Sequence, residues 1–262
     1  MPRLLIIGQG YTGARLATRL WDAGWDVIGT SRTGSDTLLA FDHPAMLDAI
    51  KGATHILLSV PPEGERDPVL ERYGEAIRVS AAEWVGYLSS TGVYGDAGGA
   101  WVDESAPVGT GRRSARAAAD LAWQALRADM RVFRLPGIYG PGRSALDRLS
   151  SPRVDAPGHL FSRIHVDDIV GAVVASFERG PGVWNVADDE PATSRAVAEC
   201  ACDLAGVPYP PLVTPDELSA PARAFYSERR AVANGKMKRD LGYRLRYPNY
   251  REGLRACVET TP

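Results

Sequence analysis

The glycines near the start of the chain have a spacing that suits binding of dinucleotide phosphates. The run Gly-Gln-Gly-Tyr-Thr-Gly at 8–13 follows the apolar segment 3–7 and precedes a segment of helical periodicity at 14–20. In a G-x-G-x-x-G turn, the first glycine permits a tight turn, the second admits the pyrophosphate, and the third lets the helix pack on the strand. N–H groups at the helix start then face the phosphates. The order of strand, turn and helix therefore favours a bound dinucleotide over a turn without a ligand. The expected contacts of the dinucleotide are Gly8, Gly10, Tyr11, Thr12 and Gly13.

The residues after the second apolar segment distinguish NADP from NAD. Ser31 and Arg32 follow the segment 26–30, and no acidic residue occurs before Asp36. NAD-binding proteins place a carboxylate near this point to hold both ribose hydroxyls. A hydroxyl and a guanidinium instead suit a 2′-phosphate. We therefore expect NADP, with NAD as the alternative if Arg32 is only a solvated loop residue.

A parallel sheet is needed to position these residues. Short apolar runs alternate with segments of helical periodicity, which is typical of βαβ units. The predicted strands are 3–7, 26–30, 55–60, 84–89, 130–135 and 182–186. One helix is predicted after Pro44, with Met46, Leu47 and Ile50 on one face, and another from Arg113, with Ala118, Leu121, Ala122, Ala125 and Leu126 at helical spacing. The predicted fold class is α/β, a doubly wound parallel Rossmann sheet with a small C-terminal lobe.

The regular alternation of strands and helices fails in two places, 140–163 and 207–230, which are rich in glycine, proline, serine or arginine. Such segments interrupt regular structure and favour a separate lobe. We therefore expect a discontinuous organisation. The NAD(P)-binding domain would comprise 1–140 plus about 163–187, and the substrate lobe about 141–162 and 188–262.

Several motifs occur in the order found in one enzyme family. They are Leu-Ser-Ser-Thr-Gly-Val-Tyr-Gly at 88–95, Arg-Leu-Pro-Gly-Ile-Tyr-Gly-Pro-Gly at 134–142, Ile-His-Val-Asp-Asp at 164–168, Trp-Asn-Val at 184–186 and Asp-Leu-Gly-Tyr at 240–243. Over nearly its whole length the chain resembles the extended or atypical short-chain dehydrogenase/reductases, the superfamily of NAD-dependent epimerases and dehydratases. The resemblance implies a Rossmann cofactor domain and a smaller lobe. Further cofactor contacts are expected at Ser59, Arg116, Leu135 and Pro136.

The resemblance also indicates where catalytic residues should be. It places Ser90 at the family's catalytic hydroxyl, which hydrogen-bonds a substrate oxygen during hydride transfer; the alternative is a serine that caps backbone groups. The family's Tyr-x-x-x-Lys pair is missing, and Arg112 and Arg116 occupy its places. Arg116 could hold a ribose hydroxyl, but a guanidinium does not deprotonate, so Arg112 could only orient or stabilise an anion. Otherwise both arginines lie on a solvated helix face. Tyr94 is a nearby phenol that could be recruited.

These residues define a leading hypothesis and an alternative. Thr91 and Gly92 occupy the places of the acidic pair of the superfamily's dehydratases, so dehydration of a sugar nucleotide is not expected. The leading hypothesis is an NADP-dependent oxidoreductase or epimerase-like enzyme of atypical type, acting on a small polar or sugar-like substrate. The alternative is a non-catalytic NADP(H)-binding sensor or regulatory protein.

Composition limits the remaining classes of partner. A formal net charge of −2 provides no field that would draw the chain to nucleic acid or a membrane surface. Cys200, Cys202 and Cys257 have neither the number nor the spacing of a disulfide framework or a zinc site. No segment has the length of a membrane span or a signal peptide, which predicts a cytoplasmic protein. A small-molecule substrate is the expected partner, and a homodimer is the alternative to a monomer.

Overall fold

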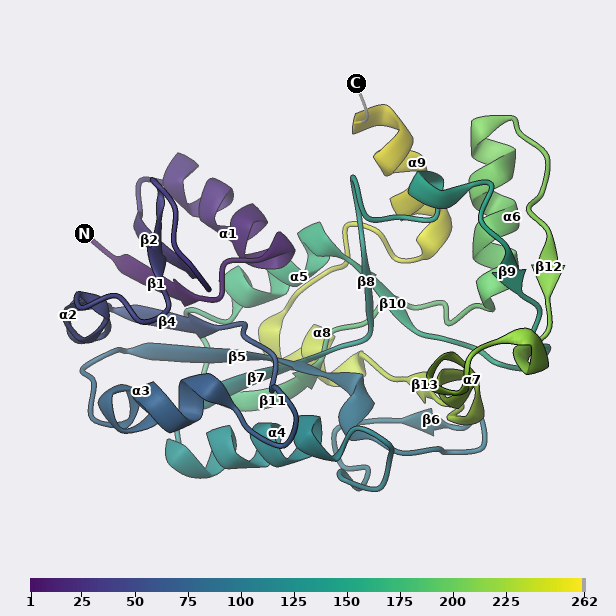
Figure 1. The fold of residues 1–262 in the computed structure, drawn as a ribbon. Coiled ribbons are helices and arrows are strands. Elements are labelled where there is room, and N and C mark those ends of the chain that lie inside the picture. Colours follow the sequence, from purple (N-terminus) through teal and green to yellow (C-terminus); the bar gives the residue numbers. More distant parts are fainter. Residues whose placement is uncertain (261–262) are drawn as a thin grey trace. The chain divides into compact units, whose positions relative to one another are not determined.

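The structure, a computed structural model, describes residues 1–260. The chain divides into two compact units, which we call the sheet unit and the second unit (Figure 1). The sheet unit consists of Met1–Val93, Arg112–Arg134 and Val170–Trp184. The second unit consists of Tyr94–Gly111, Leu135–Ile169 and the residues from Asn185 onward. Each unit is therefore built from segments that are far apart in the sequence.

A seven-stranded sheet forms the centre of the sheet unit, in the order β11-β7-β5-β4-β1-β2-β3. Its strands are β1 Arg3–Ile7, β2 Asp26–Ser31, β3 Leu38–Ala40, β4 His55–Leu58, β5 Trp84–Ser90, β7 Met130–Leu135 and β11 Gly182–Asn185. The strand β1 pairs in parallel with β2 on one side and β4 on the other, so the chain order reverses there. The predicted doubly wound α/β sheet is confirmed, and each predicted strand is present to within two residues at its ends.

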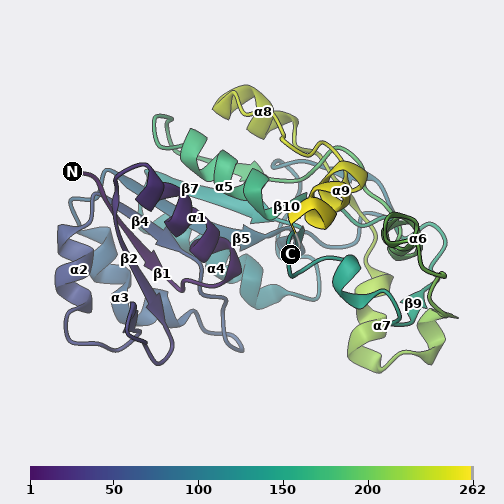
Figure 2. The same cartoon turned by 90° about the horizontal axis from the view of Figure 1, so that it is seen from above.

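Helices cover both faces of this sheet. They are α1 Tyr11–Asp22, α2 Met46–Gly52, α3 Pro68–Arg78, α4 Ser114–Leu126 and α5 Val166–Ala175. Figure 1 shows α1 on one side of the sheet and α3 and α4 on the other, and in Figure 2 α1 lies over the strands. The buried side chains of β1 and β4 form the core between these layers, since both strands are hydrophobic along most of their length.

The face that α4 buries differs from the one we expected. Leu121, expected on the buried side, is 50% exposed, whereas Asp120 and Trp123 are fully buried. Trp123 Nε1 donates to Asp67 Oδ2 at 2.8 Å, which joins α4 to the first residue before α3. Similarly, Leu47 of α2 is 58% exposed. Apolar periodicity predicted both helices, and Met46 and Ile50 of α2 are buried. It did not predict the buried face of α4, because the buried Asp120 pairs with Arg134 of β7.

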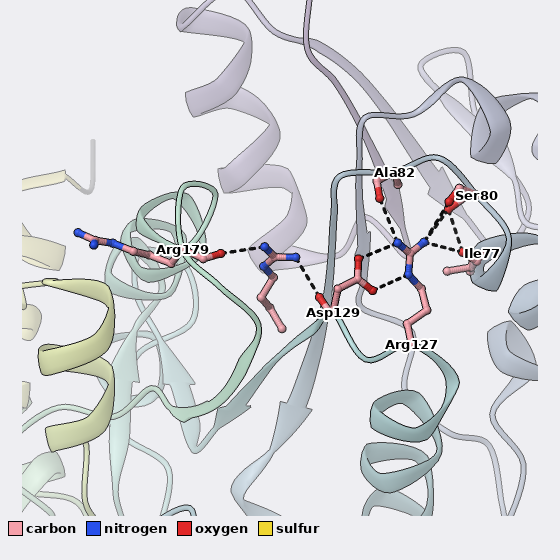
Figure 3. A network of polar contacts seen from close by, with 7 residues as sticks. Ile77, Ser80, Ala82, Arg127, Asp129 and Arg179 are labelled. Atoms are coloured by element: carbon pink, nitrogen blue, oxygen red, sulfur yellow. Dashed lines mark hydrogen bonds and ion pairs between the residues drawn. The ribbon is translucent and has the colours of Figure 1, made fainter.

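A cluster of polar residues holds the loops next to the start of β7 (Figure 3). Arg127 forms an ion pair with Asp129 at 2.7 Å and is largely buried. Its guanidinium also donates to the backbone carbonyls of Ile77, Ser80 and Ala82. Arg131 donates to the carbonyls of Asp129 and Arg179. These bonds join the end of α3 and the residues after it to the segment before β7, so the cluster has a structural role.

The second unit contains short strands and a group of helices. Its strands are β6 Trp101–Val102, β8 Gly137–Tyr139, β9 Arg153–Val154, β10 Arg163–His165, β12 Leu212–Val213 and β13 Ala231–Val232. Its helices are α6 Ser194–Ala205, α7 Ala220–Ser227, α8 Gly235–Leu241 and α9 Tyr250–Thr260, with short 3₁₀ turns at Leu146–Arg148 and Pro215–Glu217. We expected residues 94–111 in the cofactor domain, but they belong here because β6 pairs in parallel with β13.

One carboxyl group in the second unit should make stability depend on pH. Asp188 is 1% exposed, and its Oδ2 has no hydrogen-bond partner among the described residues. Burial raises the pKa of Asp188 from 3.8 to about 8, although nearby Arg163 favours the ionised form. Because the folded-state pKa lies above the unfolded one, this group's contribution to stability is complete below about pH 4 and is lost as the pH rises through about 8.

The variant Asp188→Asn should remove that dependence. We expect its free energy of unfolding, relative to that of the unmodified chain, to increase steadily between about pH 4 and about pH 8 and to level off above that. Urea denaturation at several pH values measures this difference. Parallel stability curves for the two proteins would contradict the assignment.

Candidate functional site

The loop between β1 and α1 has the backbone geometry of a phosphate-binding turn. Gly8 has a φ of +91°, and a Cβ atom there would lie 2.6 Å from Val60 Cγ2, so only glycine fits. The Gly8 N–H donates to Thr30 Oγ1 at 3.0 Å, which ties the turn to β2. At Gly10, by contrast, an added Cβ would meet nothing within 4 Å. The backbone at Gly10 is therefore open to a ligand.

The first turn of α1 is suited to an anion. Gly10 is the residue before the helix, so no side chain caps its N–H groups, and the first turn has no acidic residue. Beside it, Gln9 Oε1 is buried without a hydrogen-bond partner among the described residues. The Gln9 amide occupies the space where a side chain of Gly29 would be. An uncapped helix start with a positive dipole end fits the pyrophosphate of a dinucleotide, whereas Gln9 Oε1 is an acceptor and offers the phosphates no hydrogen bond.

The end of β2 presents the two residues expected to distinguish the cofactors. Ser31 Oγ accepts a hydrogen bond from the Gly34 N–H at 3.0 Å, which orders the loop after β2. Arg32 Nη2 lies 3.1 Å from Glu63 Oε1, with side chains 87% and 65% exposed. An ion pair this exposed contributes about 0–1 kcal/mol, so a phosphate could compete with Glu63 for the guanidinium.

The end of β5 places Ser90 with its hydroxyl proton available. Ser90 Oγ accepts from the Gly92 N–H at 3.1 Å, and its own proton has no acceptor among the described residues. The neighbouring hydroxyl of Ser89 is instead buried and donates to Asp120 Oδ2 at 2.5 Å. Successive side chains of a strand point to opposite faces, so Ser89 has a structural role while Ser90 could donate to a ligand.

The two arginines at the places of the missing Tyr-x-x-x-Lys pair do not share a helix face. The helix α4 begins at Ser114 and Arg113 is its N-cap residue, so the exposed Arg112 lies before the helix. The alternative of a helix face shared by Arg112 and Arg116 is therefore wrong. Arg116 is half-buried and lies close enough to Tyr87 to lower the pKa of that phenol, although burial raises it overall.

Sequence reasoning missed Arg113, which lies beside Ser90. A Cβ atom added to Gly92 would lie 2.7 Å from Arg113 Cδ and 3.2 Å from Ser90 Oγ. The Arg113 side chain thus passes over Gly92 on the same side as the Ser90 hydroxyl. The available signal was the glycine in a position where dehydratases carry an acid, followed later by two adjacent arginines.

The remaining expected site residues have other surroundings. Tyr94 is 1% exposed, and its hydroxyl donates to Asn185 Oδ1 at 2.8 Å, which speaks against contact with a substrate. The Ser59 N–H donates to the Ile7 carbonyl at 2.9 Å directly after β4. Leu135 ends β7 and is buried, and Pro136 follows it.

Within residues 1–260, no group of three or more His, Cys, Asp or Glu side chains has an arrangement that could hold a metal ion. None of the helices in this range is sufficiently long and apolar to cross a membrane.

Two solved structures resemble the whole chain. A conserved protein of unknown function from Silicibacter pomeroyi DSS is 42% identical, with a TM-score of 0.90 and both chains covered to 100%. The human epimerase family protein SDR39U1, solved with NADPH, is 18% identical, with a TM-score of 0.79 and coverage of 99% of this chain and 100% of that chain. The first likeness extends to sequence, whereas the second shows a common fold.

Two further proteins are similar in sequence over part of the chain. Protein YeeZ of Escherichia coli K12 is 27% identical over 214 residues, which are 71% of this chain and 77% of YeeZ. The 3-diazoavenalumate denitrifying reductase of a Streptomyces species is 31% identical over 138 residues, or 47% of this chain and 45% of the reductase. No family model matches the sequence.

Proposed function

We propose that this chain is an NADP(H)-dependent oxidoreductase. It belongs to the family of the conserved Silicibacter protein and has the fold of the extended short-chain dehydrogenase/reductases. The observation that carries this proposal is the start of α1. It combines an open backbone at Gly10 with a first turn that has neither a side-chain cap nor an acidic residue. An anion would supply the partners that this helix start lacks.

The chemistry at the end of β5 supports a reduction or oxidation rather than a dehydration. A bound nicotinamide supplies or accepts the hydride. Ser90 would donate its hydroxyl proton in a hydrogen bond to the substrate oxygen that becomes negative as the hydride arrives. The chain has no phenol beside a lysine here, so the final proton would come from water. The similarity to a reductase favours reduction of a small polar substrate over epimerisation.

The Arg32 guanidinium provides a test of the cofactor preference. We expect Arg32→Ala to weaken NADPH binding by about 1.5–3 kcal/mol, the usual range for hydrogen bonds to a charged group. NADH binding should change little, because NADH has no 2′-phosphate. Fluorescence titration of each cofactor measures both effects, with Arg19→Ala in the last turn of α1 as the control. Equal losses for the two cofactors would remove Arg32 from the 2′-phosphate site.

A second candidate is a dinucleotide-binding sensor without catalysis. Its support is the absence of the usual proton-transfer pair, whose places Arg112 and Arg116 occupy. The two functions differ in turnover. Oxidation of NADPH at 340 nm in the presence of a carbonyl panel indicates an enzyme, whereas tight cofactor binding with no turnover on any substrate indicates a sensor.

A further inference from the structure

We propose that Arg113 recognises an oxyanion on the substrate, so that the site takes a carboxylate or a phosphate ester whose charged group lies beside Ser90. This inference rests on the proposed function and specifies its substrate class. It concerns the segment formed by the end of β5, the 3₁₀ turn Thr91–Val93 and the first residues of α4, all within the sheet unit.

The position of Arg113 depends on the glycine beneath it. Any side chain at Gly92 would begin 2.7 Å from Arg113 Cδ, which is closer than real Cβ contacts. The same hypothetical atom would lie 3.5 Å from Arg113 Nε and 3.2 Å from Ser90 Oγ. The start of the guanidinium and the serine hydroxyl therefore flank one small region of backbone. An aspartate or glutamate at Gly92 would displace the arginine from this position.

The hydrogen-bonding state of Ser90 indicates what this region could bind. Its oxygen accepts from the Gly92 N–H, and its own proton is available to an acceptor on a ligand. A guanidinium offers donors only and stays charged at all ordinary pH values. The Ser90 hydroxyl and the charged Arg113 side chain thus both lie beside Gly92. The group that complements them is an oxyanion, which accepts several hydrogen bonds at once.

The charges of the surrounding segment favour an anion as well. Residues 111–119 contain three arginines, Arg112, Arg113 and Arg116, and no acidic residue. The next acid in the sequence, Asp120, is fully buried and forms an ion pair with Arg134 at 2.8 Å. In the second unit, Glu228 Oε1 lies 2.9 Å from the position that a Cβ of Gly111 would take. Residues 111–119 themselves thus contribute an excess of positive charge, which favours an anion.

The experiment uses matched pairs of small probes that differ only in charge. The full chain, saturated with NADP⁺, is titrated with acetate and acetamide, lactate and lactamide, and benzoate and benzamide, and binding is measured by saturation-transfer NMR. A parallel titration with inorganic phosphate distinguishes a phosphate ester site from a carboxylate site. We expect at least one anion to bind about tenfold or more tightly than its neutral counterpart.

The variants attribute this preference to the arginine. Arg113→Gln should abolish the preference for anions, Arg113→Lys should retain part of it, and Gly92→Ala should reduce it by displacing Arg113. The exposed Arg19→Gln serves as a control that should preserve it. NADP⁺ affinity, measured in the same samples, should remain within about threefold in every variant.

The outcomes separate this proposal from the proposed function. If NADP⁺ binds but no anion is preferred, or if Arg113→Gln retains the preference, the assignment of Arg113 is overturned and the oxidoreductase proposal stands. A loss in Arg112→Gln that equals or exceeds the loss in Arg113→Gln would also overturn it. If the unmodified chain binds no NADP(H), the proposed function itself fails.

Discussion

Replacing Asp120 by leucine is expected to lower the free energy of unfolding by about 3–5 kcal/mol. Asp120 and Arg134 form an ion pair with side chains that are 0% and 4% exposed. Arg134 Nη2 lies 2.8 Å from Asp120 Oδ1, and Arg134 Nε lies 3.1 Å from Asp120 Oδ2. Removal of the carboxylate leaves a guanidinium that is buried without its counter-charge, and this is the main physical cause of the loss.

Two further bonds increase the expected effect. Ser89 Oγ donates to Asp120 Oδ2 at 2.5 Å, and Gln124 Nε2 donates to Asp120 Oδ1 at 2.6 Å. A buried donor that loses its acceptor costs about 1–3 kcal/mol, and these terms overlap with the charge term instead of adding fully. The carboxylate thus joins β5, α4 and β7 at the centre of the sheet unit.

The double variant Asp120→Leu with Arg134→Met separates charge from packing. Replacing both partners by apolar residues of similar size removes the unpaired charge, so most of the lost stability should return. Urea denaturation followed by circular dichroism gives the free energies. As a control, the exposed i, i+4 pair of Arg195 and Glu199, at 2.7 Å, should cost less than about 1 kcal/mol when Glu199 becomes Gln. Equal losses at the two pairs would show that burial does not determine the effect.

Replacing Gly10 by aspartate should abolish cofactor binding while leaving the fold intact. Gly10 has φ −89° and ψ −156°, an extended conformation that aspartate adopts readily, and a Cβ there meets nothing within 4 Å. Aspartate is also among the residues preferred before a helix, so stability should be unchanged or slightly higher. Its carboxylate would occupy the position expected for the pyrophosphate. Like-charge contact of this kind costs several kcal/mol, equivalent to more than about 100-fold in affinity.

The neutral variant Gly10→Asn tests whether charge or volume is responsible. Both side chains cap a helix and have similar size, so we expect Asn to weaken NADPH binding much less than Asp does. Thermal unfolding and NADPH titration are measured on the same samples. If Gly10→Asp binds NADPH normally, the pyrophosphate does not lie at the start of α1, and the proposed function loses its main support.

The phosphate loop and the sheet were predictable from the sequence because local patterns determine them. The apolar strands alternate with amphipathic helices, and the glycines of 8–13 directly join the first strand to the first helix. The short strand β3, Leu38–Ala40, was not predicted, because three residues have no periodicity to detect. The glycine spacing identifies the turn. The hydrogen bonds that the Gly8 and Gln9 N–H groups donate to Thr30 of β2 could not be predicted, because they depend on the position of β2 beside the turn.

The orientation of α4 was decided by a contact between residues distant in the sequence. Apolar spacing favoured Leu121 on the buried face, yet the carboxylate of Asp120 is buried because Arg134 of β7 lies opposite. In the sequence, Arg134 begins the motif at 134–142 and Asp120 lies 14 residues before it, with no indication that the two residues pair. Hydrophobic periodicity measures only transfer from water, so it cannot detect a charge that is stabilised by a distant partner.

The sequence by itself determined the fold class, the glycine turn between β1 and α1 and the strand that ends at Ser90. Only the tertiary structure decided which arginine lies beside Ser90. Motif alignment placed Arg112 on the helix, but α4 begins at Ser114 and the side chain over Gly92 is that of Arg113. A shift of one residue changes the direction of a side chain by about 100° in a helix, and more where a loop enters it. The start of a helix is set by tertiary contacts as well as by its residues, and this is why the sequence could not show which arginine lies beside Ser90.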